Sequence, residues 1–374
     1  MKLSAKKRDI LDVLSRVQGL TGRKSSLAIT SSVLLKTIDR GIHIVATDLE
    51  TGFEGLYPAT IESEGAIAIN ARKLFEIVRD FPVDDINIAE IENHWIEISN
   101  NNIEYHIVGM DPDDFPDIPK IGDISFFEVK SNCLKEMIEK TVMVTGAPED
   151  QRAHIIGILF EHIVSEDPQS NLVRMVSLDG SWLSKVDCAC SSDIKLPTES
   201  KILIPKKGLV EVNRFIGSTG SVMVGIKDNH FIAKKATETI MIRLLEGEFP
   251  EYQGILKKTD EYDIKLDNHV FTMMLKRMSI LSSDDYKSVI FYFEKDKLTI
   301  SSTNPDIGES KENMVIEYSG KPIEVAFNPK YFIDTLNAIN DDTVIMNIMN
   351  DEKPCVLHGE NDKKFISVIA PMRV

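Results

Sequence analysis

The chain has 374 residues, 43% of them hydrophobic, which is enough apolar material for two to four domains of roughly 100–200 residues each. Its 43 basic and 59 acidic residues give a net charge of −16, which argues against a uniformly basic nucleic-acid-binding protein but allows basic residues to gather on one face. The sequence has no signal peptide, no long apolar run and only four scattered cysteines, so we expect a soluble, cytoplasmic protein without membrane contact or a disulfide framework.

An amphipathic helix is the first predicted element, and a helix of the same kind returns twice later in the chain. Each helix is followed by a β-like run that carries a short polar residue, in VLLKTIDRGIHIVATD, LVRMVSLDG and KLTISSTN. The helices are predicted over residues 6–17, 131–142 and 269–280, and the polar residues are Asp48, Asp179 and Asn304.

A second helix is predicted after each of these polar residues, and the strand residues Ile69, Ile204 and Phe327 that precede it lie 21 to 25 residues beyond Asp48, Asp179 and Asn304. The stretches are IAINARKLFEIVRDF, LIPKKGLVEVNRFIG and AFNPKYFIDTLNAIN. In each stretch a β-like run passes into a helical pattern, at Ala71, Lys206 and Pro329 respectively. Leu74 and Val78 then share one face of the first of these helices.

Short alternating strands fill the rest of each unit, as in DINIAEI, HWIEIS, SVMVGI and TVIMNIM, and they are typical of antiparallel sheets with one buried face. A Phe-Pro pair closes the first two units, at residues 115–116 and 249–250. Solenoid repeats have periods of only about 20–50 residues. The interval between equivalent helices of successive units is longer in this chain, which indicates three copies of one domain. The predicted fold class is therefore α+β with three tandem copies of one unit, and we expect the domains at 1–122, 123–252 and 253–374.

Motifs for catalysis are absent: there is no Walker loop, GxGxxG, HExxH, GxSxG or CxxC pair. Cys188 and Cys190 would place two thiols on one strand face, but no nearby histidine or second pair completes a metal site, so small buried hydrophobes are favoured. We therefore expect no catalytic residue, no cofactor and no metal. Acidic doublets are interpreted as solvated turns rather than as metal ligands, and they are Asp84-Asp85, Asp284-Asp285 and Asp341-Asp342.

Basic residues gather at the predicted helices. Residues 1–24 carry seven basic side chains against two acidic ones. Such residues often only solvate exposed helix faces, and that interpretation stays open. Alternatively, equivalent helices of the three units line one basic surface that holds phosphates through non-specific contacts. The residues concerned are Arg72, Lys73, Lys206, Lys207, Lys276, Arg277 and Lys330.

Over essentially its whole length, the sequence resembles the bacterial sliding clamp, the β subunit of DNA polymerase III. Each matching segment is short, but their order and spacing agree throughout. The segments are VLL…ATDLE (33–50), ARKLFEIVR (71–79), DDFP (113–116), QRAHIIGILFE (151–161), LDGSWL (178–183), IPKKGLVE (204–211), RLLEGEFPEY (243–252) and the final PMRV.

The resemblance implies a head-to-tail homodimeric ring that encircles double-stranded DNA without sequence specificity and serves as a processivity factor. Such a protein is an accessory subunit of a DNA-directed DNA polymerase holoenzyme, not an enzyme in itself. It would tether the DNA polymerase III catalytic subunit, the clamp loader and other replication and repair proteins. The implied DNA contacts are Arg23, Lys24, Lys73, Arg152 and His154, and the implied dimer contacts are Tyr105, Ile107, Ile280 and Leu281.

Partners of this family insert short peptides into a hydrophobic pocket between the second and third domains. The chain departs from the common pattern there: it has LDGSWL where the family often reads TDGHRL, and Ala370 where a larger Met is often found. A further departure, Glu149, lies in a loop that can touch DNA. The positions that match the pocket are Ile155, Leu178, Gly180, Ser181, Leu183, Pro250, Ile255, Val368, Pro371, Met372 and Arg373.

Two other functions fit the sequence less well. One is an enzyme that acts on nucleic acid through a carboxylate metal site, and the missing motifs count against it. The other is a repeat scaffold that does not bind DNA, which retention on nicked circular DNA would separate from a clamp.

Overall fold

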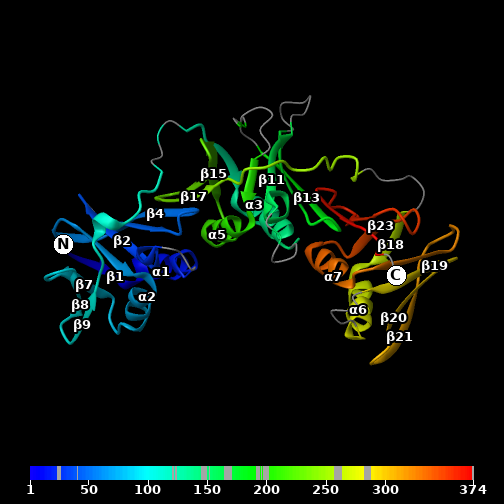
Figure 1. Ribbon diagram of the computed structural model, residues 1–374, viewed down its shortest axis with the longest axis horizontal. Helices are drawn as coiled ribbons and strands as arrows, with labels where there is room; N and C mark the ends of the chain where they lie inside the picture. The colour runs from blue at the N-terminus through cyan, green and yellow to red at the C-terminus, as the bar shows by residue number, and fades with distance from the viewer. Residues whose placement is uncertain are drawn as a thin grey trace. The chain divides into compact units, whose positions relative to one another are not determined.

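The computed structural model describes residues 1–22, 27–39, 41–119, 122, 124–144, 150, 152–163, 171–190, 194, 196, 202–256, 263–281 and 288–372. The chain forms two compact units, each built of antiparallel sheets and helices (Figure 1). The first unit comprises Met1–Lys135, Cys190–Thr198 and Ile204–Leu244, and the second comprises Glu136–Ala189, Glu199–Leu203 and Leu245–Val374. Within the described residues, no helix is long and apolar enough to cross a membrane.

The three predicted first helices are present, each directly after a short strand. The helix predicted over 131–142 has these bounds, and the other two differ from the prediction by one to four residues at their ends. These strand–helix pairs are β1 (Lys2–Lys6) with α1 (Lys7–Thr21), β10 (Phe127–Lys130) with α3 (Ser131–Val142), and β18 (Asp263–Asp267) with α6 (Asn268–Met278).

The three predicted second helices are also present, and polar side chains fix where two of them begin. Asn70 accepts a hydrogen bond from the backbone N–H of Lys73 at 3.0 Å, and Asn328 accepts one from Lys330 at 3.0 Å. Such caps satisfy N–H groups that have no partner inside the helix. These pairs are β6 (Ala66–Asn70) with α2 (Ala71–Asp80), β14 (Ile202–Pro205) with α5 (Lys206–Ile216), and β22 (Ile323–Phe327) with α7 (Pro329–Ala338).

The repeated Asp or Asn of the sequence lies in a tight turn at the end of a strand. The Asp48 carboxylate accepts hydrogen bonds from the backbone N–H groups of Glu50 at 3.1 Å and Thr51 at 2.6 Å. Asn304 accepts one from Asp306 at 3.0 Å in the equivalent position. A short side chain that bonds the backbone two residues ahead forms an Asx-turn, which explains why each repeat keeps a short polar residue there.

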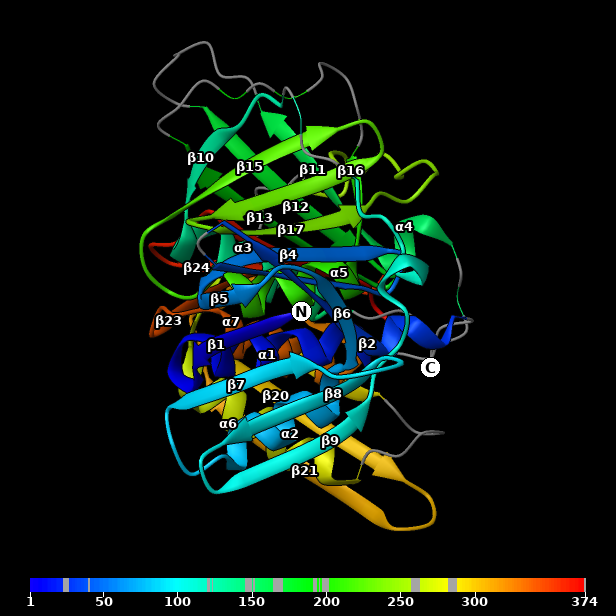
Figure 2. The same ribbon diagram turned by 90° about the vertical axis from the view of Figure 1, so that its left-hand side faces the viewer.

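Two antiparallel sheets build the first unit. Figure 2 shows β7, β8 and β9 side by side, with β9 outermost. The five-stranded sheet has the order β5 (Thr60–Ser63), β1, β7 (Asp85–Glu90), β8 (Trp95–Asn100) and β9 (Ile103–Val108). The eight-stranded sheet has the order β10, β15 (Ser221–Lys227), β16 (His230–Lys235), β17 (Glu238–Arg243), β4 (Thr51–Pro58), β3 (Gly41–Thr47), β2 (Ser32–Ile38) and β6.

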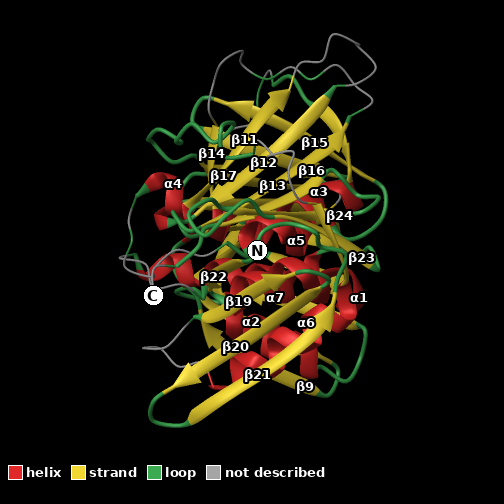
Figure 3. Cartoon of the chain, turned by 90° about the vertical axis from the view of Figure 1, so that its right-hand side faces the viewer, coloured by secondary structure: helices red, strands yellow, loops and turns green. Residues whose placement is uncertain are grey.

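Two further antiparallel sheets build the second unit. Figure 3 shows β19, β20 and β21 side by side, with helices behind them. The eight-stranded sheet has the order β14, β11 (Gly157–Ile163), β12 (Leu172–Leu178), β13 (Trp182–Ala189), β25 (Phe365–Ile369), β24 (Cys355–Gly359), β23 (Thr343–Asn347) and β18. The four-stranded sheet has the order β21 (Gly308–Val315), β20 (Lys297–Asn304), β19 (Val289–Glu294) and β22.

An aromatic core holds α6 and α7 to the four-stranded sheet. Phe291 and Phe327 pack edge to face with ring centroids 5.2 Å apart, and Phe327 and Phe332 lie 5.0 Å apart. Phe271 of α6 completes the group, and all four side chains are fully buried. Each such pair contributes about 0.5–1.5 kcal/mol beyond the burial of its apolar area.

Candidate functional site

A buried apolar cluster lies on the eight-stranded sheet of the second unit. Leu178 pairs with Leu183 across β12 and β13, and Leu183 pairs with Val368 of β25, so these side chains share one face of the sheet. Ile155, from the short helix α4 (Ala153–Ile156), packs on the same group. The structure therefore brings together four residues that the resemblance placed in the peptide pocket.

Several members of this cluster were missed by the sequence interpretation. Phe249 and Tyr252 belong to the segment that follows the first unit, and both are buried in the cluster. The Phe-Pro repeat did mark Phe249, but only as the end of a unit. Pro250 and Ile255 of the same segment are exposed, Ile255 by 42%. The further missed members are Leu159, Val176, Leu203 and Val356.

Polar contacts anchor Tyr252 at the edge of the cluster. Its hydroxyl donates to the Glu161 carboxylate and accepts a hydrogen bond from Arg174 at 3.3 Å. Burial raises the pKa of Tyr252 to about 12, so the hydroxyl remains a donor at neutral pH. Although burial opposes its charge, two hydrogen bonds to Asp187 and one to Tyr252 hold the pKa of Arg174 above its usual range. These bonds keep the covering segment on the sheet.

The turn between β12 and β13 links the cluster to the C-terminal segment. Asp179 accepts hydrogen bonds from the N–H groups of Ser181 at 3.0 Å and Trp182 at 2.8 Å. Gly180 has a φ of +92°, a conformation that favours glycine. The carbonyl of Ser181 accepts a hydrogen bond from Ala370 at 2.7 Å. Gly180 and Ser181 are exposed and therefore border the cluster rather than join it.

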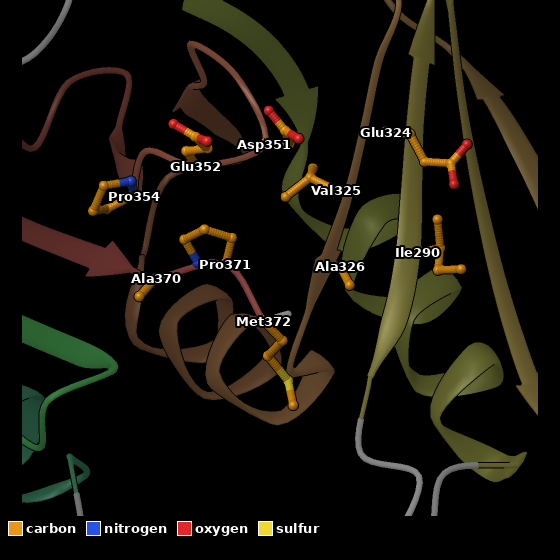
Figure 4. Close-up of a pocket in the computed structure, with 10 residues that line it drawn as sticks. All are labelled: Ile290, Glu324, Val325, Ala326, Asp351, Glu352, Pro354, Ala370, Pro371 and Met372. Atoms are coloured by element: carbon orange, nitrogen blue, oxygen red, sulfur yellow. The ribbon is translucent and has the colours of Figure 1, made fainter. Parts of the chain in front are cut away.

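A cavity of about 950 Å³ lies beside this C-terminal segment (Figure 4). The N–H of Met372 donates to the carbonyl of Ala326 at 2.8 Å, which attaches the segment to the edge of β22. Three carboxylates, from Glu324, Asp351 and Glu352, line the cavity together with apolar side chains. Arg373 lies outside the described residues. The apolar lining residues are Ile290, Val325, Ala326, Pro354, Ala370, Pro371 and Met372.

Trp182, one of the departures from the family pattern, faces away from the apolar cluster. It is 2% exposed, and its indole N–H donates to the hydroxyl of Ser367 at 2.9 Å. Its ring stacks on Tyr331 of α7. Successive side chains of a strand point to opposite faces, so Leu183 lies in the cluster while Trp182 packs towards the helix. Trp182 therefore packs beneath the turn, between β13 and α7.

Among the implied DNA contacts, Lys73 is exposed near the start of α2. Its ammonium group pairs with Glu76 at 2.9 Å, and Arg72 pairs with the same carboxylate at 3.0 Å. The hydrogen bonds from Lys73 and Arg72 lower the pKa of Glu76. Lys207, Lys276 and Lys330 are also exposed near the starts or ends of their helices, as both interpretations of the basic residues require.

Arg152 and His154 lie at the start of the short helix α4. Arg152 is exposed and forms hydrogen bonds to both oxygens of Asp150, the shortest at 2.6 Å. These bonds lower the pKa of Asp150 to about 2, so the pair is charged at neutral pH. His154 is half-buried. The remaining residues assigned near DNA, Arg23, Lys24 and Glu149, lie outside the described residues.

The implied dimer residues lie on one sheet edge and in one short helix. Tyr105 and Ile107 belong to β9, which ends its sheet, and Tyr105 is 39% exposed. Ile280 is 75% exposed, while Leu281, which ends the same short helix (Ser279–Leu281), is half-buried. The carbonyl of Leu281 accepts a hydrogen bond from Asn304 at 3.0 Å, which fixes this helix next to β20. The structure does not bring the two sets together within one unit.

The cysteines differ from the sequence interpretation in one respect. Cys188 and Cys190 are buried, as expected for small hydrophobes. Cys133 and Cys188 are disulfide-bonded, whereas Cys190 and Cys355 are not. The bond at Cys188 was not foreseen, because a sequence does not show which sulfur atoms the fold brings together. A disulfide-bonded Cys188 also does not serve as a metal ligand with Cys190.

Comparison with known proteins gives a single family. Models of the DNA polymerase III beta subunit match the N-terminal domain over residues 1–119, the central domain over 128–251 and the C-terminal domain over 254–373. The beta sliding clamp of Chlamydia pneumoniae is 26% identical over 377 residues, covering 100% of this chain and 99% of that protein. The beta sliding clamp of Escherichia coli K12 is 26% identical over 378 residues, covering 100% of both.

Solved structures agree with this fold. A DNA polymerase III beta subunit from Eubacterium rectale is 28% identical, with a TM-score of 0.92 and full coverage of both chains. The sliding clamp from Bacillus subtilis is 21% identical, with a TM-score of 0.91, and covers 100% of this chain and 99% of its own; at this identity it shows the fold alone. The three domain models follow one another in the order of the three sequence repeats and together span nearly the whole chain. The chain therefore belongs to the DNA polymerase III beta subunit family, the bacterial sliding clamps.

Proposed function

We propose that this chain is a DNA polymerase processivity factor that encircles duplex DNA and tethers the replicative polymerase in the cytoplasm. The observation that carries the proposal is the succession of three family domains over one α+β fold with tandem repeats. Members of the family are accessory subunits without catalytic residues, so the carboxylate-enzyme alternative is set aside. Domain boundaries at 1–122, 123–252 and 253–374 are part of the proposal.

The ring forms from two chains joined head to tail. In this arrangement β9 of one chain, with Tyr105 and Ile107, meets the edge of the partner that carries Ile280 and Leu281. Both edges expose apolar residues, including Val108 at 62% and, at the end of the edge strand β21, Val315 at 86%. An exposed apolar edge strand favours pairing with another chain. Because the two edges differ, their contact is heterologous, and two copies close the ring.

Contacts with DNA are made to phosphates. Lys73, Arg152 and His154, with Arg23 and Lys24, supply basic side chains in a chain whose net charge is −16. Contacts of this kind weaken as salt is added and do not read the base sequence. A ring that holds DNA by enclosing it needs only weak contacts of this kind, and it remains free to slide.

Partner peptides bind along the surface that runs from the apolar cluster to the acidic cavity. Ile255, which is exposed beside the cluster, and Met372, which is 38% exposed in the cavity, offer apolar contacts to spaced Leu and Phe anchors. Peptides of the polymerase III catalytic subunit, the clamp loader and repair proteins compete for this surface. Since three carboxylates line the cavity, a peptide with a basic residue near its anchors binds more tightly.

The experiment that tests the proposed function measures retention on DNA. The chain is loaded by a clamp loader onto nicked circular DNA, which is then cut at one site. A ring stays on the closed circle and slides off the linear product, whereas a protein that binds the duplex directly stays on both. Equal retention on the two forms contradicts the clamp, and light scattering reports independently whether the chain is a dimer.

A further inference from the structure

Two carboxylates and one imidazole come together on the sheet that ends in β9. Glu97 of β8 lies directly opposite His106 of β9, and Glu104 precedes His106 by two residues. Residues that face each other across strands, or alternate along one strand, point to the same side of a sheet. Figure 2 shows these two strands side by side at the sheet edge. The three side chains therefore share one face.

Their distances suit the coordination of one ion. The Nε2 atom of His106 lies 2.9 Å from Oε1 of Glu104 and 3.8 Å from Oε2 of Glu97. One ligand atom from each residue lies within 4.8 Å of the other two. Metal–ligand bonds of about 2.0–2.2 Å require neighbouring ligand atoms only a few ångströms apart, so small side-chain rotations complete the geometry.

A fourth side chain orients the site. The hydroxyl of Ser99 donates to Oε1 of Glu97 at 2.7 Å, which leaves the other carboxylate oxygen directed at His106. A hydrogen-bonded partner of this kind holds a ligand in place before the ion arrives. Lys2 is the nearby cation, and it pairs with Glu62 at 2.7 Å.

We propose that Glu97, Glu104 and His106 form a binding site for a divalent transition-metal ion such as Zn²⁺. An imidazole nitrogen with two carboxylates suits Zn²⁺, Mn²⁺ or Co²⁺, whereas Mg²⁺ and Ca²⁺ prefer oxygen ligands. The ion's two positive charges balance the two carboxylates. By joining β8 to β9, the bound ion fastens the outermost strand to its neighbour.

Two other histidines in the chain provide contrasts. His94 approaches Glu90 through Nδ1 at 3.6 Å but Asp111 through Nε2 at 3.9 Å, so its two carboxylates face different ring nitrogens. His43 approaches Glu54 alone, at 3.4 Å. In the part of the chain that the structure describes, Glu97, Glu104 and His106 are the only group of three such ligands. His94 and His43 therefore serve as matched controls.

The test is titration of the full-length chain with ZnCl₂ by calorimetry, after treatment with a chelator. We expect a saturable site in the wild type that is absent in His106→Ala and retained in His94→Ala and His43→Ala. Ser99→Ala should weaken this site by about tenfold, as loss of an orienting partner usually does.

Co²⁺ provides a second readout, because its visible absorption reports on its ligands. The absorption expected with the wild type should be lost in Glu104→Gln, a substitution that preserves shape and removes charge. Circular dichroism checks that each variant folds. Absence of Zn²⁺ binding to the wild type, or equal binding to wild type and His106→Ala, overturns the proposal, and neither result bears on the clamp function.

Discussion

Trp182 and Tyr331 stack with their ring centroids 4.9 Å apart and their planes inclined by 24°, and this contact joins β13 to α7. The indole N–H bonds Ser367, whose hydroxyl lies 2.8 Å from that of Thr335, so a buried polar chain continues from the stack into the helix. The residue pattern LDGSWL thus gives the turn an apolar anchor. The surface above this turn is the proposed peptide site.

Replacing this anchor should destabilise the second unit. Trp182→Ala removes a fully buried ring and leaves Ser367 with one hydrogen-bond partner fewer, so we expect the free energy of unfolding to fall by about 3–5 kcal/mol. Urea unfolding followed by circular dichroism measures the loss. Trp95→Ala is the control, because Trp95 is 46% exposed and its loss should change stability by no more than about 0.5 kcal/mol.

Removal of the last five residues should abolish most peptide binding. The deletion takes away Ala370, Pro371 and Met372, which line one side of the cavity, and leaves every helix and named strand complete. Each buried anchor contributes about 1.5–3 kcal/mol, so losing the contacts of two anchors weakens binding by roughly a hundredfold or more. Calorimetry with a peptide from the polymerase measures the change, and equal affinities would place the peptide site elsewhere.

The acidic lining of the cavity has its own test. Glu324→Gln with Glu352→Gln should remove the preference for a peptide with a basic residue while leaving a neutral peptide unaffected. Adding salt should weaken the basic peptide more than the neutral one in the wild-type chain, because exposed charges are screened.

Replacing Ile280 and Leu281 with Ala should give folded monomers. Ile280 is exposed and Leu281 only half-buried, so the change removes little of the core but takes apolar contact from the proposed dimer edge. Light scattering gives the mass. Leu49→Ala provides a matched control, since Leu49 is 46% exposed and lies away from both edges in the sequence. A dimer that persists in the double variant rules out this placement of the interface.

Asp150→Asn should strengthen DNA binding. The carboxylate of Asp150 holds Arg152 by accepting hydrogen bonds at both of its oxygens and, with a pKa of about 2, stays ionised at neutral pH. Without that charge, Arg152 becomes available to a phosphate. Each added phosphate contact steepens the fall of log affinity with log salt by about 0.9. The same slope in both proteins would show that Arg152 does not reach DNA.

Stability at acid pH should depend on Asp341. Hydrogen bonds from the backbone N–H groups of Asp362 at 3.0 Å and Asn361 at 2.6 Å lower the pKa of Asp341. Because the folded state has the lower pKa, the stabilisation is complete above the usual aspartate pKa and is lost as the pH falls below it. Asp341→Asn should therefore lower the melting temperature at pH 7 and make less difference at pH 3. A constant difference would exclude this carboxylate as the cause.

Local patterns predicted more of this fold than of its sites. The helices, their order and the repeated polar turns follow from short-range spacing, as Asn70 and Asp48 show. Predicting the apolar cluster would have required the strand register and the position of the segment that covers the sheet. Phe249 and Tyr252 were therefore missed, although their neighbours Pro250 and Ile255 were identified. The pairing of Glu97 with His106 likewise depends on the register of β8 and β9. Composition also does not show which basic side chains are already paired with a carboxylate, as Arg152 is with Asp150.

One chain carries two different sheet edges, β9 and β21, and this difference has a consequence for assembly at high concentration. Head-to-tail contacts can add one chain after another, so the proposed two-membered ring would compete with linear oligomers that leave an unpaired edge at each end. Closure is favoured because the second contact forms within one complex, at a high effective concentration. Any condition that holds the ring open therefore shifts a ring–chain equilibrium towards growth, and we expect opened clamps to form short filaments unless another protein covers β9 or β21.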